Sequence, residues 1–454
     1  MSASPLDQAK ALRAKGRWAE SADVLAPVVS DEPQNFQATY YYAMALLESG
    51  QAPKAQPHFE RMLSAGKHLA EARYMLARCH MEQGHVAEAR QCFEASHVLK
   101  PTPMTLRSLA NLDWMAGDVD RFRARLRGAE GPLRVFAYGL WIESEDFEGA
   151  EHAWQAIGSA TRSSPEALTL RAQHMRHIGD GPASLKAACA AQRLTQDSAA
   201  VVDAVAVAHL MCGDGPSALE TIAPIRKSQP HDQHWLAHET TALRLMGDDR
   251  FDALVDVKAH VRPFTLPVPE GYRSLPEFNE RLLTELDAKH RFSNHPLDQS
   301  LRSGTQTAQG LLTMESPAVR AYIRALDGPI RSFMRDIGDA PDHPLTARNT
   351  GAYRIKGCWS VRLKACGHHV NHVHPEGWIS SAYYVSVPEG GEGRAGWIKF
   401  GEPPFVTQPK LEPLHWVQPK AGMLVLFPSY LWHGTEPIGH GATRVTAPFD
   451  VVPA

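Results

Sequence analysis

The sequence has few cysteines, and none has the spacing of a disulfide framework or a cysteine-type zinc site. Six cysteines are scattered over 454 residues without a Cys-x-x-Cys pair. Stability must therefore come from apolar burial, and the length predicts two or three domains. Hydrophobic residues make up 43% and charged residues 21% of the chain, the composition of a globular protein.

Long apolar runs and a dominant charge are also missing. No run reaches the length that crosses a bilayer, and the first residues lack the charged-then-apolar order of a secretory signal. We therefore expect a cytoplasmic protein without a membrane partner. The net charge of −3 and the lack of a basic, aromatic patch argue against nucleic-acid binding. The sequence contains no Walker-type loop and no Gly-x-Gly-x-x-Gly between a strand and a helix, so it gives no indication of nucleotide binding.

Glycines recur with a regular period in the first half of the chain. Their steps are 34, 34 and 33 residues and, after a gap of 62, again 34 and 34. The glycines are Gly16, Gly50, Gly84, Gly117, Gly179, Gly213 and Gly247. Alanines keep the same register at Ala43, Ala77, Ala110, Ala172 and Ala206 before the glycines and at Ala55, Ala89 and Ala218 after them. Each unit is therefore predicted to be two closely packed antiparallel helices with a tight turn at the glycine.

The gap of 62 residues leaves room for one shortened unit near 143–154. The whole pattern, over about residues 5–255, resembles tetratricopeptide (TPR) repeats. That resemblance implies an α-solenoid with a concave face that binds a protein or peptide. The alternative is that the helices only pack on the neighbouring domain or mediate self-association. The oligomeric state stays open, a homodimer included.

The periodic pattern stops near Ala253. The following segment, 261–272, contains three prolines and one glycine, as a linker does. An amphipathic helix is predicted over 275–292, and short β-branched and aromatic runs between Gly and Pro turns then predict antiparallel strands. We expect a TPR α-solenoid over 1–258, a linker over 259–274 and a β-rich domain over 275–454. The fold class is multidomain α + β, with two folds in tandem.

Four histidines stand within seven positions in the stretch HHVNHVHPEGW, residues 368–378. On a strand, residues i and i+2 point to the same face, so His372 and His374 would aim at one point. His433 follows a later apolar strand, and Arg444 lies eleven residues beyond it, two before Thr446. Histidines held on one face with open positions are typical of non-haem iron sites. A guanidinium at this offset matches a carboxylate in shape, and a hydroxyl adds a hydrogen bond.

Aromatic residues follow the first histidine motif directly. Tyr383 and Tyr384 alternate on a predicted strand, so one of them should face the pocket. We take Tyr384 as the candidate that donates its hydroxyl to a cosubstrate, with core packing as the alternative. Trp378 is a candidate for the wall of a substrate entrance, again with core packing as the alternative.

Several ordered motifs resemble bacterial 2-oxoglutarate–Fe(II) oxygenases, which often carry N-terminal TPR repeats. They are SLRSGTQT (300–307), WSVRL (359–363), HVHPEGWISSAYYVSVP (372–388) and LFPSYLWHGTEP (426–437). The resemblance covers about 265–454 and extends distantly to prolyl hydroxylases and aspartyl/asparaginyl β-hydroxylases. It implies a double-stranded β-helix (jelly-roll) domain that binds Fe(II) and 2-oxoglutarate. It also implies that O₂ is consumed, succinate and CO₂ are formed, and a protein or peptide side chain brought by the TPR region is hydroxylated.

We expect His372, His374 and His433 to hold the metal, and Arg444, Thr446 and Tyr384 to bind 2-oxoglutarate. One position departs from the family, because His374 stands where the usual carboxylate ligand would be. Three arrangements stay open: a three-histidine site, two histidines with a water, or Glu376 as the ligand.

The alternative to an enzyme is a TPR interaction scaffold with an inactive or zinc-binding barrel. Arg444 and Thr446 distinguish the two functions, because a scaffold needs no basic residue at that offset.

Overall fold

The computed structural model describes residues 4–389 and 392–454, so the first three residues of the predicted TPR domain lie outside the described range. The chain divides into two compact units, Met1–Asp113 and Trp114–Ala454. The predicted limits of 1–258, 259–274 and 275–454 rest on changes of sequence pattern, and they stay a prediction. The fold class, multidomain α + β, is confirmed: a region of paired helices precedes an antiparallel β-sheet domain.

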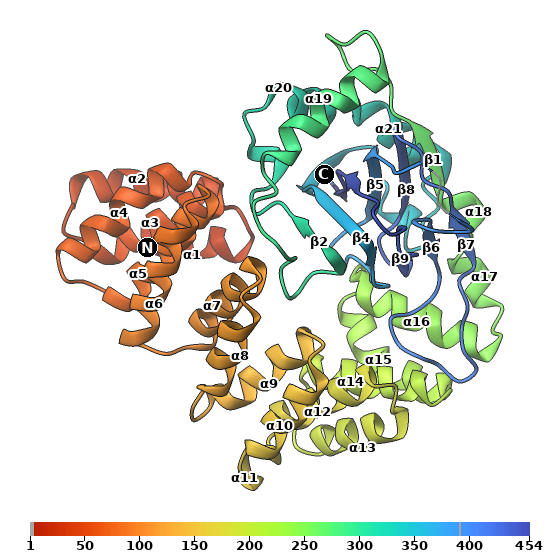
Figure 1. Cartoon of the computed structure of the whole chain (residues 1–454), viewed down its shortest axis with the longest axis horizontal. Coiled ribbons are helices and arrows are strands. Elements are labelled where there is room, and N and C mark those ends of the chain that lie inside the picture. The colour runs from red at the N-terminus through yellow and green to blue at the C-terminus, as the bar shows by residue number, and fades with distance from the viewer. Residues whose placement is uncertain (1–3, 390–391) are drawn as a thin grey trace. The chain divides into compact units, whose positions relative to one another are not determined.

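The TPR region consists of short helices connected in pairs (Figure 1). In the described residues these are α1 (Pro5–Ala14), α2 (Trp18–Asp31), α3 (Phe36–Glu48), α4 (Ala52–Ser64), α5 (Leu69–Glu82), α6 (Val86–Leu99), α7 (Pro103–Ala116), α8 (Val119–Arg127), α9 (Leu133–Glu143), α10 (Phe147–Ala156), α11 (Ser159–Arg162), α12 (Pro165–His177), α13 (Gly181–Gln192), α14 (Ala199–Met211), α15 (Gly215–Ser228) and α16 (Gln233–Met246). Two short helices follow, α17 (Arg250–Leu254) and α18 (Val257–His260).

The sequence period corresponds to the turns and the seams of these helices. All seven periodic glycines have positive φ, between 64° and 82°, as a tight turn after a helix requires. All eight periodic alanines are at most 1% exposed, so they form the close contacts between helices. The shortened unit in the gap is the α9–α10 pair, and Glu145, with φ of 58°, takes the place of a turn glycine there.

In its described residues, the β-rich domain contains two antiparallel sheets, as expected for a jelly roll. Its strands are β1 (Arg262–Thr265), β2 (Leu301–Gln306), β3 (Tyr353–Cys358), β4 (Val361–His369), β5 (Ile379–Ser386), β6 (Ile398–Phe400), β7 (His415–Val417), β8 (Met423–Pro428), β9 (His433–Thr435), β10 (Arg444–Thr446) and β11 (Phe449–Pro453). The larger sheet has the order β1-β8-β5-β10-β4-β2, with β11 pairing β3 and β5. The smaller sheet has the order β7-β6-β9.

The segment expected to be a linker contributes a strand to the larger sheet. β1 pairs with β8 over four residues, from Arg262 opposite Leu426 to Thr265 opposite Met423. Leu266, directly after it, is 1% exposed and belongs to the main core. β1 is an edge strand, where a proline such as Pro263 is tolerated. A proline-rich edge strand therefore has the composition of a linker.

Three helices cover one face of the larger sheet (Figure 1). They are α19 (Leu275–Asp287), α20 (Pro317–Ala325) and α21 (Asp327–Ile337), and two 3₁₀ turns, η1 (Leu311–Thr313) and η2 (Thr346–Arg348), connect the remaining segments. Phe278, Tyr322 and Phe333 are fully buried between these helices and the sheet. The Tyr322 hydroxyl also donates to the Ala447 carbonyl at 2.5 Å, which fixes α20 to the chain between β10 and β11.

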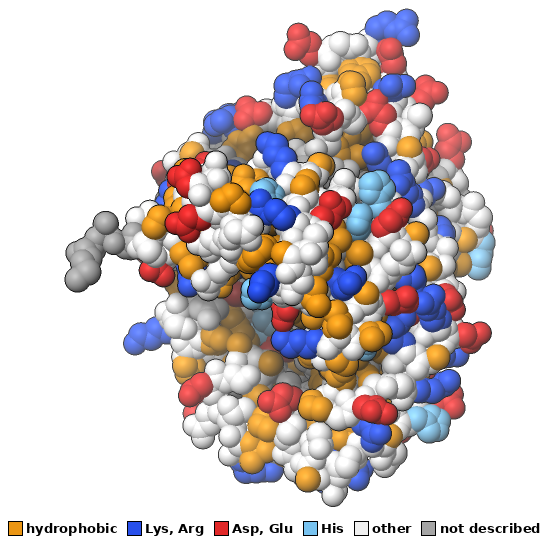
Figure 2. Space-filling model, turned by 90° about the vertical axis from the view of Figure 1, so that its left-hand side faces the viewer, with side chains coloured by type: hydrophobic (Ala, Val, Ile, Leu, Met, Phe, Trp, Pro, Cys, Tyr) orange, Lys and Arg blue, Asp and Glu red, His pale blue; other side chains and the backbone are white. Residues whose placement is uncertain are grey.

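The face drawn in Figure 2 carries side chains of both charges, in keeping with the near-neutral sequence. Acidic and basic side chains are intermixed over the face drawn in Figure 2. Among the described residues, no helix combines the length and the apolar character that crossing a bilayer requires.

Candidate metal and cofactor site

The three candidate histidines lie on two neighbouring chain segments. His372 and His374 are on one segment, and His433 is on β9. His372 and His374 belong to the connection between β4 and β5, so they do not lie within a strand as expected. His372 instead forms an isolated bridge with His433: each backbone N–H donates to the other's carbonyl, at 2.9 and 3.0 Å. The His374 N–H donates to the Ser429 carbonyl at 3.1 Å. The extended backbone between these bonds still directs both side chains to one side.

The imidazoles of His372, His374 and His433 (the histidine triad) converge. Their ring centroids are 4.2 Å apart for His372 and His433, and 5.2 Å for each pair with His374. One nitrogen of each ring lies within 4.8 Å of those of the other two. Three imidazole nitrogens at this spacing form a set of donors suited to a divalent transition metal.

The other nitrogen of each ring is held by an acceptor. Nδ1 of His372 lies 2.9 Å from the Val370 carbonyl, and Nδ1 of His433 lies 3.0 Å from the Leu431 carbonyl. Nδ1 of His374 lies 2.7 Å from a carboxylate oxygen of Asp450. Each Nδ1–H is thus placed to donate, which leaves each Nε2 lone pair for a metal. Burial lowers the pKa of His372 to about 3 and that of His433 well below its usual value, so both rings are neutral, the form that binds metal.

The two carboxylates near the triad have different positions. Glu376, the alternative ligand considered from the sequence, forms an ion pair with Lys356 and its side chain is 80% exposed. Asp450 is largely buried behind His374 and also accepts from the Ser380 hydroxyl at 2.8 Å. These positions favour His374 as the third donor, with Asp450 orienting it from behind.

Arg444 is a fully buried arginine in the same pocket. In the described part of the chain it has no ion-pair partner, and its Nε has no hydrogen-bond partner. Its Nη1 donates to the Gly396 carbonyl at 2.6 Å. The guanidinium lies 5.6 Å from the ring centre of Tyr384, whose buried hydroxyl also lacks a partner among the described residues. Burial lowers the pKa of Arg444 and raises that of Tyr384.

Strand pairing explains why these groups lie together. Arg444 and Thr446 lie on one face of β10, and Thr446 is paired with Tyr384 of β5. Val445, between them, points into the main core. A buried guanidinium and two hydroxyl groups on one wall fit a carboxylate of a small acid, because each donor would gain an acceptor.

A pocket of about 1010 Å³ joins the histidine triad to this wall. Its lining includes the triad, Arg444, Thr446 and Tyr384, together with Asp450. The TPR region contributes to it as well, through Glu143 of α9 and His177 of α12. Arg302 of β2, which also lines the pocket, forms an ion pair of 2.7 Å with Glu145 and so connects the β-rich domain to the TPR region.

Several positions differ from the sequence-based expectation or were missed by it. Trp378 is fully buried and donates from Nε1 to the Leu345 carbonyl at 2.7 Å, so it belongs to the core and not to a substrate entrance. Tyr383 points to the opposite face from Tyr384 and donates to Asn279 Oδ1 at 2.5 Å. His369 and Ser300 line the pocket, and the Ser300 hydroxyl lies 3.3 Å from Nε2 of His372. Ser300 is 72 residues from its partner, and no local pattern links the two.

Comparison with known proteins supports both halves of this description. Residues 357–450 match the family described as "Putative 2OG-Fe(II) oxygenase". Residues 6–68 and 46–96 match two tetratricopeptide repeat families. The chain therefore contains TPR repeats followed by a 2OG-Fe(II) oxygenase-type domain, and that family implies Fe(II) and 2-oxoglutarate.

Individual relatives are distant. The chain is 22% identical over 233 residues to DnaJ homolog subfamily C member 3 of Rattus norvegicus, covering 51% of this chain and 44% of that protein, so it spans less than half of that relative. A prolyl-4-hydroxylase structure from Pseudomonas putida is similar at 16% identity and a TM-score of 0.30, over 44% of this chain and 96% of that one. A tetratricopeptide repeat protein from Parabacteroides merdae is similar at 13% identity and a TM-score of 0.34, over 55% of this chain and 88% of that one.

Proposed function

We propose that the protein is an Fe(II)- and 2-oxoglutarate-dependent oxygenase that hydroxylates a side chain of a protein or peptide recruited by the TPR region. His372, His374 and His433 hold the metal through Nε2. Arg444, Thr446 and Tyr384 hold the distal carboxylate of 2-oxoglutarate. When bound, the metal and 2-oxoglutarate supply the oxidative chemistry, in which O₂ is consumed and succinate and CO₂ are formed.

The observation that carries this proposal is Arg444. A buried guanidinium with no ion-pair partner in the described part of the chain is costly, because burial penalises its charge. Arg444 would lose that cost by pairing with a carboxylate of 2-oxoglutarate. Arg444 Nε and the Tyr384 hydroxyl, neither of which has a hydrogen-bond partner among the described residues, supply donors for the same carboxylate.

The chain's own residues set the conditions for the reaction. Asp450 fixes the ring of His374, while the Val370 and Leu431 carbonyls fix the other two rings, so that three lone pairs meet at one place. Phe427 and Ile398 line the pocket with apolar surface, which excludes water from the reacting centre. Glu143 and His177 line the same pocket from the TPR helices, which supports a polypeptide substrate that contacts both parts.

The test is anaerobic binding of Fe(II) and then 2-oxoglutarate to the full chain, followed by the visible metal-to-ligand charge-transfer band. We expect the band in the wild type, its loss in His433→Ala, and a 2-oxoglutarate affinity at least tenfold lower in Arg444→Lys. Arg362→Ala is the matched control: it removes a partly buried arginine of the adjacent strand β4 that bonds the His290 carbonyl and lies outside the pocket.

Absence of the band in the wild type, with zinc or no metal bound after Fe(II) loading, would contradict the proposal. It would favour a TPR interaction scaffold with a zinc-binding or inactive barrel. An equal loss of affinity in Arg362→Ala and Arg444→Lys would remove Arg444 from the cosubstrate site.

A further inference from the structure

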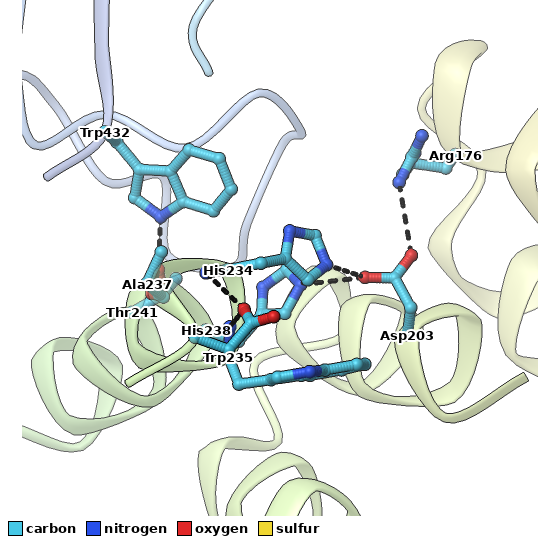
Figure 3. Close-up of polar contacts among 9 residues, drawn as sticks. Arg176, Asp203, His234, Trp235, Ala237, His238, Thr241 and Trp432 are labelled. Carbon is cyan, nitrogen blue, oxygen red and sulfur yellow. Dashed lines mark hydrogen bonds and ion pairs between the residues drawn. The ribbon is translucent and has the colours of Figure 1, made fainter. Parts of the chain in front are cut away.

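A second group of metal-binding side chains lies in the last TPR helices, away from the histidine triad. It consists of Asp203 on α14 and of His234 and His238 on α16 (the Asp203 cluster) (Figure 3). Residues i and i+4 of a helix lie on the same face, so both imidazoles point from α16 toward α14. Asp203 projects from α14 to meet them, as Figure 3 shows.

The three donor atoms already form a compact set. Nε2 of His234 and Nε2 of His238 lie 2.6 and 2.9 Å from the same oxygen, Oδ1 of Asp203. The two Nε2 atoms lie 3.1 Å from each other. Donors about 2.0–2.1 Å from a tetrahedral zinc ion lie about 3.3 Å from one another. The three pairs of donors must therefore separate by about 0.2 to 0.7 Å to admit the ion.

The surroundings hold the cluster in place and leave one side reachable. Arg176 lies 3.9 Å from the other carboxylate oxygen, Oδ2 of Asp203, which leaves Oδ1 for the shared position. His238 is 2% exposed and packs against Trp432 and Phe405 at 5.8 and 6.2 Å between ring centres. The His234 side chain is 31% exposed, so an ion and a water molecule can approach from its side.

We propose that the Asp203 cluster binds a zinc ion through Asp203 Oδ1 and the Nε2 atoms of His234 and His238, separately from the histidine triad. Two imidazole nitrogens and one carboxylate oxygen are a donor set that zinc accepts, with water in the fourth position. The ion replaces the protons that now lie between the rings and Asp203, and binding therefore releases protons.

An ion here would connect α14 to the helix that supports both segments of the histidine triad. The indole N–H of Trp432, the residue before His433, donates to Thr241 Oγ1 of α16 at 2.8 Å. The backbone N–H of Gln233, the first residue of α16, donates to the carbonyl of Pro375, which follows His374. The role of the zinc is thus structural, on the helix behind the pocket.

The test measures zinc on the full-length double variant His372→Ala/His433→Ala, which lacks the triad, so that the result does not depend on the proposed oxygenase function. We expect this protein to retain one equivalent of zinc after dialysis and to give the visible spectrum of tetrahedral cobalt when Co²⁺ replaces it. Adding Asp203→Asn or His234→Ala should remove the equivalent and weaken zinc binding at least a hundredfold. His231→Ala is the control, because His231 is exposed three residues before His234.

Folding is monitored in the same samples by circular dichroism and thermal unfolding. Zinc should raise the Tm of the double variant and of its His231→Ala derivative but not that of the His234→Ala derivative. The proposal is overturned if the folded double variant binds no zinc. It is also overturned if both the Asp203→Asn and His234→Ala derivatives keep one equivalent.

Discussion

The orientation of each triad histidine depends on the acceptor behind its ring. For His372 and His433 that acceptor is a backbone carbonyl two residues earlier, at 2.9 and 3.0 Å. For His374 it is the carboxylate of Asp450, which comes from β11. His374 is thus the one ring of the triad held by a charged acceptor, and such a partner strengthens metal binding.

Asp450→Asn should therefore weaken metal binding at the triad by roughly ten- to hundredfold, because the variant keeps an acceptor but removes its charge. The measurement is an anaerobic Fe(II) titration with a competing chelator. Glu376→Gln is the matched control, since Glu376 is exposed and paired with Lys356, and it should leave the affinity unchanged. The opposite pattern would make Glu376 the third ligand and leave His374 off the metal.

Tyr383 and Tyr384 give a paired test of the cosubstrate wall. Tyr384→Phe removes a buried hydroxyl that has no partner among the described residues, so the cofactor-free protein should gain up to about 1 kcal/mol in free energy of unfolding. The same change should weaken 2-oxoglutarate about fivefold or more, through the lost hydrogen bond. Chemical denaturation and titration of the charge-transfer band measure the two effects.

Tyr383→Phe is the comparison, because its hydroxyl donates to Asn279 in the core. It should lower stability by about 1 kcal/mol and leave 2-oxoglutarate binding unchanged. A stabilising Tyr383→Phe, or an unchanged cosubstrate affinity in Tyr384→Phe, would contradict this assignment.

The sequence could predict the candidate residues that have a local pattern and not those that lack one. His372 and His374 are two residues apart, and Arg444 and Thr446 are likewise two residues apart on a strand. Asp450 has no such signal, since 76 residues separate it from His374 and only the pairing of β11 with β5 brings it close.

At the scale of helices and strands, the strongest signal was the glycine and alanine period, because each position has a fixed steric role. All seven periodic glycines have positive φ, and all eight periodic alanines are buried. Strand β1 gave the opposite signal, since prolines around it indicated a linker. Composition could not distinguish the two, because an edge strand needs hydrogen bonds on one side only.

Leu266→Ala tests whether the segment after β1 belongs to the barrel. Leu266 is 1% exposed in the main core, so its truncation should cost about 2–5 kcal/mol in the free energy of unfolding of the β-rich domain. Val268→Ala, two residues on and 48% exposed, should cost less than about 0.5 kcal/mol. Urea unfolding monitored by tryptophan fluorescence measures both, and equal costs would mean that the segment is a free linker.

At the scale of the whole molecule, buried neutral histidines make stability depend on pH. Burial lowers the pKa of His290 and of His295 to about 4 each, against an ordinary value of 6.5. The unfolded chain therefore takes up protons before the folded one as pH falls. The contribution is complete above about pH 6.5 and is lost as pH falls toward 4.

We expect the urea midpoint to fall between pH 6.5 and pH 4.5, with a loss of up to several kcal/mol, since one pKa unit corresponds to about 1.4 kcal/mol. The variant His231→Gln, at an exposed position, should give the same curve as the wild type. A midpoint that stays constant over this range would show that the two buried rings are protonated in the folded protein.

The contacts of helix α16 with the β-rich domain limit how the repeats can be exchanged during evolution. Helix α16 accepts a hydrogen bond from Trp432 and donates one to the Pro375 carbonyl. In addition, Arg244 of this helix donates to the Gly401 and Glu412 carbonyls at 2.8 and 2.7 Å. The final repeat is therefore bonded directly to the β-rich domain, although its sequence follows the period of the TPR repeats. Recombination could exchange the earlier repeats and so alter which partner the TPR region recognises. A crossover between α16 and β1, where the two sequence patterns meet, would instead separate α16 from the part of the β-rich domain that it supports. The hydrogen bonds between the two would then be lost.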